Sequence, residues 1–547
     1  MRPGSDFDDL VTAGEAEPAG TDGDWELDEE PPGSRIDDWW ERRGATTQRA
    51  LRWVAPAAVV VTAATTRLWG LGHPASLVFD ETFYVKDAWT LWNLGYEGSW
   101  PAEADVQFNA GQSNIFLTDP SFVVHPPLGK WIIGLGMEWL GADNPVGWRI
   151  MTAIVGILAV ILLMLVAKKL FQSALLATIA GGLMAIDGNA IVMSRVALLD
   201  NSVMFFALLG FGAILLDREW SARRLALWYS TRADAGRPTD WGPALWLRPW
   251  LVAAGLAFGL ATAVKWNGLY FLAAFAVYSL VVDAVARRRA GVTFWLSGTI
   301  WKQGPVTFLL TVPIAVAAYF TTWIGWFRST DGYDRLWSSQ NDNAWGGLLA
   351  WVPRALQSWW HFEVQVYNYN VGEHRPHAYQ ANPLTWLFLV RPTSMYYQGS
   401  TAGENGCTSN CGEWITGLAN PLIWWAATAA ILYLSYRLVR YREWKVGLIL
   451  AGMAAGYLPW LLYTGRTVFQ FYTIAFEPYL LLGLVFVIGM ILGTARDPRW
   501  QRTSGIRLVA IFIGLAIAIS VFFWPVWTGQ LISYDLMAFH WWLPSWR

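Results

Sequence analysis

The chain has 547 residues, of which 54% are hydrophobic and 15% are charged, and its formal net charge is −2. Charged residues make up about 25% of an ordinary soluble protein. Several stretches between charges exceed the roughly 18 apolar residues that span a bilayer, which excludes a set of soluble domains and predicts an all-α polytopic membrane protein. A nucleic-acid-binding protein is excluded as well, because the sequence has no clustered basic face.

Residues 1–50 differ from the rest of the chain because Asp, Glu, Gly and Pro dominate them. Such a segment cannot bury enough apolar surface to offset its chain entropy, so we expect a disordered acidic tail. A solvated tail and a tail that binds a cytoplasmic partner both fit this composition. We expect residues 51–547 to form one membrane-embedded domain.

About eleven hydrophobic segments, each near the 20 residues that a membrane-spanning helix needs, follow the tail. With the N-terminus inside, every loop on the inner face carries Lys or Arg, which predicts an N-inside, C-outside orientation. The segments are 52–71, 149–167, 174–192, 200–217, 250–264, 269–286, 304–323, 420–436, 446–463, 469–492 and 506–526.

This topology leaves two long segments on the outer face, residues 72–148 and 324–419. The apolar stretch Trp131–Leu140 in the first is too short to span, so we expect interfacial or re-entrant helices there. The second is polar and aromatic and contains Cys407 and Cys411. These two cysteines form either a small-loop disulfide, in an oxidising compartment, or two free thiols.

The adjacent acids Asp80 and Glu81 lie just after the first span, in an otherwise apolar and aromatic stretch. Ionisable groups near the membrane are costly, and each is therefore a functional candidate. Neighbouring residues do not share one helical face, so one carboxylate can meet a substrate while the other organises a neighbouring cation. The alternative is a solvated acidic turn that caps an interfacial helix.

A second group of candidates is His125-Pro-Pro-Leu-Gly-Lys130, followed by Arg149 at the start of the second span. The proline pair fixes the approach to a helix, which places His125 before a helix N-terminus that suits an anion. The alternatives are a simple helix-entry turn and, for Arg149, snorkelling to the lipid headgroups.

Further cations occur in the short turns of the outer face: Arg195, Lys265 and Arg466. Arg195 lies five residues before Asp200, and a structural ion pair between the two is an open alternative. Cations that share one leaflet are well suited to a phosphate or diphosphate. Together with the two acids they suit transfer of a group from a lipid-linked phosphate to a hydroxyl, with a carboxylate as general base and cations that neutralise the leaving phosphate.

The motifs of the chain resemble those of the protein O-mannosyltransferases. The likeness lies in Val78–Tyr84, His125–Lys130, Arg149, Arg195 with Asp200, Lys265–Gly268, His377–Pro383, Trp386 and Arg391-Pro392. The resemblance implies a GT-C fold of glycosyltransferase family 39. It also implies inverting transfer of mannose from polyprenyl-phosphate mannose to Ser or Thr hydroxyls of exported, unfolded, Ser/Thr-rich proteins. The implied site is the extracytoplasmic face of the plasma membrane, with the secretion translocon as a partner.

The resemblance also implies roles for individual residues. Asp80 becomes the general base, and Glu81 a supporting acid paired with Arg149. The donor-phosphate candidates are Lys265, which leads, and then Arg195, Arg149, Arg466, His125 and Lys130. The acceptor-side candidates are His377, Tyr379, Trp266 and Asn267.

The chain also departs from the pattern of the family that it resembles. The 324–419 segment is too short to hold the soluble β-trefoil domain of eukaryotic members together with the family motifs, which indicates the bacterial, actinobacterial-type branch. Ala378 stands where the family has proline after the late histidine. Asp80 and Glu81 could ligate Mg²⁺ or Mn²⁺, but no third acidic ligand is evident, so no cofactor is assigned.

Three rival readings remain. Another GT-C enzyme that acts on a glycolipid or glycan would share the early acids and the outer cations, although the Lys265–Gly268 and His377–Tyr379 blocks argue against it. A flippase for lipid-linked sugars would need a polar path at the bilayer midplane. A structural scaffold leaves the outer-leaflet cations without a purpose.

Overall fold

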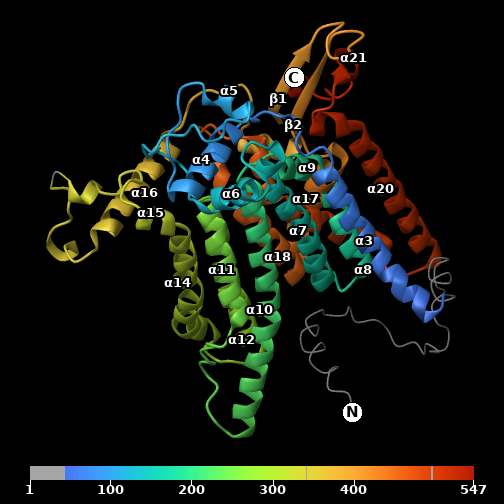
Figure 1. The fold of residues 1–547 in the computed structure, drawn as a ribbon. Helices are drawn as coiled ribbons and strands as arrows, with labels where there is room; N and C mark the ends of the chain where they lie inside the picture. The colour runs from blue at the N-terminus through green and yellow to red at the C-terminus, as the bar shows by residue number, and fades with distance from the viewer. Residues whose placement is uncertain (1–42, 341, 495–496) are drawn as a thin grey trace.

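The computed structural model describes residues 43–340, 342–494 and 497–547. Most of the described chain is a bundle of long helices, and short helices and a small sheet gather at one end of it (Figure 1). The expected acidic tail lies largely outside the described residues. Its boundary changes, however, because the first described helix, α3 (Ala45–Leu68), begins inside the range assigned to the tail.

Within the described ranges, seven helices are long and apolar enough to cross a membrane. They are α7 (Pro145–Phe171), α10 (Asp200–Asp234), α12 (Gly268–Arg289), α13 to α14 (Trp295–Thr322), α17 (Pro421–Tyr441), α18 with η5 (Trp444–Leu462) and α20 (Arg499–Thr528). An eighth span results if α8 (Ala174–Ile186) and α9 (Gly188–Arg195), which meet at a bend of 60°, are counted together. The other three expected segments fall on α3, α11 (Pro249–Val264) and α19 (Glu477–Leu492).

The bend between α8 and α9 has a local cause in Asp187. Its carboxylate accepts hydrogen bonds from the backbone N–H groups of Asn189 (2.8 Å) and Ala190 (3.3 Å), which starts a new helix at this point. Its second oxygen accepts from the N–H of Asn420 at 3.0 Å, which ties the bend to the start of α17.

The first long loop contains the expected interfacial helices: α4 (Glu81–Leu94), α5 (Ala104–Asn109) and α6 (Leu128–Leu140). The second long segment, 324–419, folds into α15 (Ile324–Arg328), α16 (Arg354–Gly372), short 3₁₀ turns that include η4 (Pro383–Phe388), and two strands. A small aromatic core that includes Tyr96 and Phe362 joins the two segments.

The expectation of an all-α chain is corrected by a three-stranded antiparallel sheet. Strands β1 (Thr393–Ser400), β2 (Cys411–Gly417) and β3 (Ile532–Ser533) lie in the order β1-β2-β3. The strands contain neighbouring aromatic and β-branched residues, such as Tyr396-Tyr397 and Trp414-Ile415-Thr416, which favour extended backbone. Cys407 and Cys411 form a disulfide in the connecting hairpin.

The chain ends with α21 (Tyr534–Ala538) and η7 (Pro544–Trp546) beside this sheet, and η6 (Gln470–Ala475) precedes α19. In Figure 1 the sheet, α4, α5 and α6 lie at the upper end of the bundle, whereas the end of α10 projects at the opposite end. The starts of α4, α7 and α10 meet at the upper end, where the candidate site residues converge.

Candidate active site

Glu81 is the first residue of α4, and its side chain is fully buried. Arg149 donates to it twice, from Nε to Oε1 at 2.8 Å and from Nη2 to Oε2 at 2.7 Å. The backbone N–H groups of Val78 (2.8 Å) and Ala197 (2.7 Å) donate to the same two oxygens. The predicted pairing with Arg149 is present, and each oxygen of the Glu81 carboxylate accepts two hydrogen bonds.

The expectation that Arg149 binds a donor phosphate is corrected by its hydrogen bonds. Besides its two bonds to Glu81, it donates to the carbonyl groups of Leu71 (3.3 Å), Pro74 (2.8 Å) and Ser76 (2.8 Å). All five N–H groups of a guanidinium are therefore used. Arg149 holds the segment before Asp80 in place and has no donor left for a ligand.

Arg195 also has a structural role, which corrects two expectations. Its guanidinium donates to the carbonyl groups of Trp69 (2.7 Å) and Gly70 (3.0 Å) and, at 3.3 Å, to those of Thr66 and Arg67. It therefore caps the C-terminal end of α3, where carbonyl groups lack helical partners. It neither pairs with Asp200 nor presents its charge to a phosphate.

Asp200 instead pairs with Lys265. The Lys265 ammonium lies 3.1 Å from both carboxylate oxygens of Asp200, and both side chains are buried. Asp200 is the first residue of α10, and Lys265 directly follows α11. The ammonium also lies 4.1 Å from the ring centre of Tyr472, a distance that permits a cation–π contact.

Asp80, at the N-cap of α4, differs from its neighbour Glu81 because its carboxylate makes no hydrogen bond or ion pair within the described ranges. It is half-buried rather than sealed. Burial raises the pKa of Asp80 to about 6; the charge of Lys265 lessens this increase and that of Asp200 adds to it. Asp80 therefore lies within electrostatic reach of the Lys265–Asp200 pair, and a common pocket for these residues stays a prediction.

His125 lies in the same cluster, with its ring centre 5.8 Å from that of Tyr84 on α4. Burial lowers the pKa of His125 well below its ordinary value, and the charges of Lys265, Lys130 and Arg466 lower it further. The imidazole is therefore neutral near pH 7. It can line the cluster as a neutral group, but it does not supply the positive charge that an anion site before a helix would use.

Lys130 is engaged elsewhere in the first loop. It is buried and forms an ion pair with Glu97, next to Asp87. Burial raises the pKa of Asp87 to about 7, an increase to which Glu97 adds and which Lys130 lessens. Lys130 therefore balances acids between α4 and α6, which corrects its expected role as a phosphate ligand.

Arg466 remains a donor-side candidate. It is half-buried, and its Nη2 donates to Oδ1 of Asn370 at 2.8 Å. Its charge acts on Lys265, His125 and Tyr472, so it lies on the same side of the cluster. Its other terminal amino group makes no hydrogen bond to the described part of the chain and can meet an anion.

The late loop that contains His377 reaches the site through Phe79, the residue before Asp80. The His377 ring packs edge-on against Phe79 at 6.0 Å and against Phe469 at 5.0 Å. Its Nδ1 accepts from the N–H of Tyr379 at 3.1 Å, and Arg391 lies 5.0 Å from the Tyr379 ring. Of the four expected acceptor-side residues, His377 contacts the Asp80 segment and Tyr379 lies beside His377, with 6.1 Å between their ring centres. Both are at least partly open to solvent.

Trp266 and Asn267 connect the site to the second long segment. The Trp266 indole N–H donates to the hydroxyl of Tyr319 (3.1 Å), which donates to Glu363 on α16 (2.6 Å). The buried Oδ1 of Asn267 has no hydrogen-bond partner in the described part of the chain. Trp266 therefore fixes the geometry behind Lys265, whereas the Asn267 oxygen is open to a further donor.

Sequence reasoning missed two aromatic members of the cluster, Tyr84 and Tyr472. Burial raises the pKa of both hydroxyl groups, and the charges of Asp80 and Asp200 act on both. Tyr84 lies within the motif that carried the resemblance, but a tyrosine has little signal in a chain with 38 Trp and 20 Tyr.

The chemistry of the cluster follows from which charges are already paired. The Glu81 carboxylate accepts hydrogen bonds from Arg149 and from backbone groups, and the Asp200 carboxylate pairs with Lys265. Of these three acids, Asp80 is therefore the one whose carboxylate is free to take a proton. In the described ranges no three His, Cys, Asp or Glu side chains are grouped as metal ligands would be. The arrangement offers one base and two cations at one end of a helix bundle.

Comparison with known proteins gives consistent matches over most of the chain. Residues 57–326 match the family model of dolichyl-phosphate-mannose-protein mannosyltransferase, and residues 355–546 match that of the C-terminal four-transmembrane region of protein O-mannosyltransferase. A polyprenol-phosphate-mannose–protein mannosyltransferase of Mycolicibacterium smegmatis (strain MKD8) is 33% identical over 91% of this chain and 94% of its own. The protein of the same name from Mycobacterium tuberculosis (strain CDC 1551 / Oshkosh) is 30% identical over 90% and 92%.

A solved structure supports the fold independently. The Saccharomyces cerevisiae protein O-mannosyltransferase complex bound to the sugar donor aligns with a TM-score of 0.66 over 95% of both chains, at 15% sequence identity. This likeness extends to the arrangement of the helices and shows that the chain shares the fold of that protein O-mannosyltransferase. The chain belongs to the dolichyl-phosphate-mannose-protein mannosyltransferase family.

Proposed function

We propose that this chain transfers mannose from polyprenyl-phosphate mannose to Ser or Thr hydroxyls of exported proteins, with inversion at the anomeric carbon. The observation that carries the proposal is the free Asp80 carboxylate beside the Lys265–Asp200 pair. The names of the mycobacterial relatives, polyprenol-phosphate-mannose–protein mannosyltransferases, support the donor and the acceptor class.

In the proposed reaction, the donor phosphate faces Lys265 and Arg466. Asp80 accepts the proton of the acceptor hydroxyl while the oxygen attacks the anomeric carbon of mannose. The bond between that carbon and the phosphate oxygen breaks, and the two cations stabilise the negative charge on the departing polyprenyl phosphate. No leaving-group acid is required, because a phosphate leaves as an anion.

Asp200 has a positioning role in this reaction. A lysine ammonium is a compact charge on a flexible stem, and the two oxygens of Asp200 hold it in one place, 3.1 Å from each. The fixed ammonium then stabilises developing charge without first having to reorganise. Asp200 also raises the pKa of Asp80, which favours a base able to hold a proton near neutral pH.

The proposed membrane arrangement has eleven spans, with α3, α11 and α19 added to the seven long helices and the bent pair α8–α9. The 27 residues of α7 extend about 40 Å, from Arg149 beside Glu81 to Lys168 and Lys169 at the far end. Arg287, Arg288 and Arg289 end α12, which likewise begins beside the site, at Gly268. Basic residues favour the cytoplasmic face, so the site faces outward, with the N-terminus inside and the C-terminus outside.

This topology suits a plasma-membrane enzyme that modifies unfolded, Ser/Thr-rich chains as they leave the translocon. A reagent that cannot cross membranes should label a cysteine placed at Glu138 on α6 in intact cells. It should not label one placed at Arg289, and the reverse pattern would overturn the orientation.

The test of the function is an assay with the purified chain, labelled polyprenyl-phosphate mannose and a Ser/Thr-rich peptide. The proposal predicts that mannose appears on the peptide and is lost when its Ser and Thr residues are replaced by Ala. Transfer of mannose to a glycolipid or glycan, with none to the peptide, would overturn the proposed acceptor and favour another lipid-phosphate sugar transferase.

A further inference from the structure

The end of the bundle opposite Asp80 contains a cavity that the proposed reaction does not use. It has a volume of about 660 Å³ and lies between the last turns of α10, the loop 238–246 and the start of α14 (Gly304–Thr322). We name it the α10–α14 pocket; its lining includes Trp228, Arg232, Asp240, Trp241, Trp246, Lys302 and Leu309.

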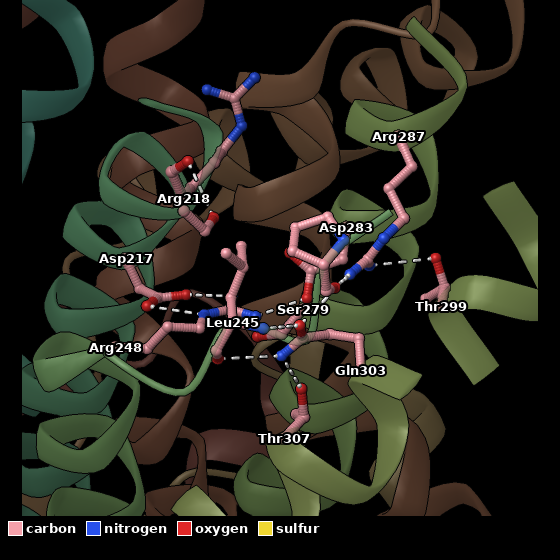
Figure 2. A network of polar contacts seen from close by, with 12 residues as sticks. Asp217, Arg218, Leu245, Arg248, Ser279, Asp283, Arg287, Thr299, Gln303 and Thr307 are labelled. Atoms are coloured by element: carbon pink, nitrogen blue, oxygen red, sulfur yellow. Dashed lines mark hydrogen bonds and ion pairs between the residues drawn. The ribbon is translucent and has the colours of Figure 1, made fainter. Parts of the chain in front are cut away.

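One wall of the α10–α14 pocket is held by buried hydrogen bonds (Figure 2). The N–H of Leu245 donates to Oε1 of Gln303 at 2.9 Å, and the Gln303 amide also lies 3.4 Å from the hydroxyl of Thr307. Nη2 of Arg287 donates to the carbonyl of Pro243 at 2.5 Å. These bonds fix the loop 238–246 to α12 and to Gln303, the residue before α14.

A buried ion network lies beside these hydrogen bonds, as Figure 2 shows. Arg248 donates to Asp283 on α12 at 2.6 Å and from Nε to Asp217 on α10 at 3.2 Å. One arginine at the start of α11 thereby joins three helices. Because Arg248 pairs with both carboxylates and all three side chains are buried, the network provides a rigid support and its charges do not face a ligand.

The cations that line the pocket, in contrast, keep donors free. Arg232 uses Nε for the carbonyl of Pro238 at 3.1 Å, and its two terminal amino groups make no hydrogen bond in the part of the chain that the structure describes. Lys302 makes one long contact, 3.4 Å to the carbonyl of Gly242. Both cations lie near tryptophan rings, Arg232 at 5.2 Å from Trp228 and Lys302 at 5.9 Å from Trp241.

Asp240 adds a negative group to the same lining. Its Oδ1 accepts from the hydroxyl of Thr293 at 3.2 Å, and within the described ranges it has no ion-pair partner. A carboxylate beside two free cations disfavours a purely anionic ligand. The lining instead matches a ligand that carries a phosphate and an ammonium group.

The surface around the pocket is that of a membrane interface. Trp246 and Leu309, which line the pocket, are 57% and 48% exposed, and Trp301, next to Lys302 in the sequence, is 74% exposed. Tryptophan is enriched where hydrocarbon meets headgroups. Lys302 is also part of a π-helical turn, η1 (Thr299–Gln303). Such turns are rare in proteins overall, but those that occur are often found at functional sites.

We propose that the α10–α14 pocket binds the headgroup of a membrane phospholipid that bears a primary amine. Arg232 and Lys302 hold the phosphate, Asp240 holds the ammonium group, and the acyl chains pass over Trp246 and Leu309. The site lies in the leaflet opposite the one that contains Asp80. The inference rests on the proposed membrane arrangement but not on mannose transfer, so the two can fail separately.

The test is native mass spectrometry of the purified full-length protein in detergent, with phosphatidylethanolamine, phosphatidylglycerol or phosphatidylcholine added at equal concentration. Wild type should retain phosphatidylethanolamine most strongly. The double variant Arg232→Ala/Lys302→Ala should bind it about tenfold more weakly, since each cation near the membrane surface contributes to binding of a lipid phosphate. Asp240→Asn should remove the preference over phosphatidylcholine.

The matched control is Arg224→Ala. Arg224 lies on the same helix, 5.6 Å from the ring of Trp220, and does not line the pocket. It should retain the lipid like wild type, and thermal unfolding of every variant in the same detergent should confirm that the protein is folded. Equal retention by wild type and the double variant would overturn the site. Retention of phosphatidylglycerol at the level of phosphatidylethanolamine would overturn the assignment of the amine.

Discussion

The two ends of the helix bundle both bury acids and cations, but they balance them differently. At the end shown in Figure 2, Arg248 forms ion pairs with both Asp217 and Asp283, so each of the three charged groups has a partner. At the other end, Lys265 is held by Asp200, while Asp80 is left without a partner within the described ranges. A group of charges that are all paired serves to join helices. An unpaired carboxylate near the membrane is costly to retain, and it therefore indicates a functional role.

The same contrast separates the adjacent residues Asp80 and Glu81. The Glu81 side chain is fully buried and its carboxylate receives four hydrogen bonds, so it cannot meet a substrate. Asp80 is half-buried and its pKa is raised to about 6. Which of two neighbouring acids is the base thus follows from their hydrogen bonds and not from their order in the sequence.

The substitution Asp80→Asn should have the largest effect on turnover. It removes the proposed base but keeps the size of the side chain, so transfer should fall by about 10²- to 10⁴-fold. The measurement is mannose transfer to a peptide by the purified protein. Glu138→Gln, on an exposed carboxylate of α6, is the control and should leave the rate unchanged. A variant Asp80→Asn with the wild-type rate would remove Asp80 from this role.

The substitution Arg248→Ala should act on stability instead. It leaves Asp217 and Asp283 buried without their cation, which costs about 3–5 kcal/mol for a broken buried pair. The midpoint of unfolding in detergent should fall, while transfer per folded molecule stays near wild type. Reduced mannose transfer by Arg248→Ala with an unchanged unfolding midpoint would contradict the claim that this end of the bundle contributes to stability and not to catalysis.

The substitution Glu81→Gln should resemble Arg248→Ala more than Asp80→Asn. Arg149 would keep its charge and its buried place but lose the carboxylate, at a cost of about 3–5 kcal/mol. Unfolding in detergent measures this loss. An unchanged midpoint together with a complete loss of transfer would show that Glu81 takes part in the chemistry directly.

The substitution Lys265→Gln should mainly weaken use of the donor. A charge-assisted contact contributes about 1.5–3 kcal/mol, which corresponds to a donor KM raised at least about tenfold. Arg466→Gln should have a smaller effect in the same direction, because Arg466 is half-buried and more strongly solvated. Transfer measured over a range of donor concentrations separates KM from kcat, and an unchanged donor KM in Lys265→Gln would discard the phosphate assignment.

The sequence predicted much of this site, and its errors have physical causes. Spacing and leaflet placed Lys265 and Asp80 together, and the pairing of Glu81 with Arg149 was expected. Arg195 and Asp200 are five residues apart, but a helix start lies between them and sends their side chains to different partners. A cation can bind a ligand only if backbone carbonyl groups do not already accept all its hydrogen bonds. The sequence does not show which cations have such carbonyl partners.

The fold was predicted in outline for similar reasons. Hydrophobic length locates long helices well, and each of the eleven expected segments coincides with a helix or a bent helix pair. The hairpin that contains Tyr396 and Trp414 was missed, because aromatic residues in a membrane protein also suit interfacial helices and loops. The α10–α14 pocket depends on loop 238–246 folding back onto Gln303, which is a contact between distant segments.

The pH dependence of a single turnover tests the central claim most directly. Asp80 must be ionised to accept a proton, so with a pKa of about 6 the rate should fall about tenfold per pH unit below pH 6 and level off above it. Asp87 has a pKa raised to about 7 but lies with Lys130 and Glu97, so Asp87→Asn should keep the same inflection. A rate that stays constant from pH 5 to pH 8, with donor saturating and protein folded, would contradict Asp80 as the base.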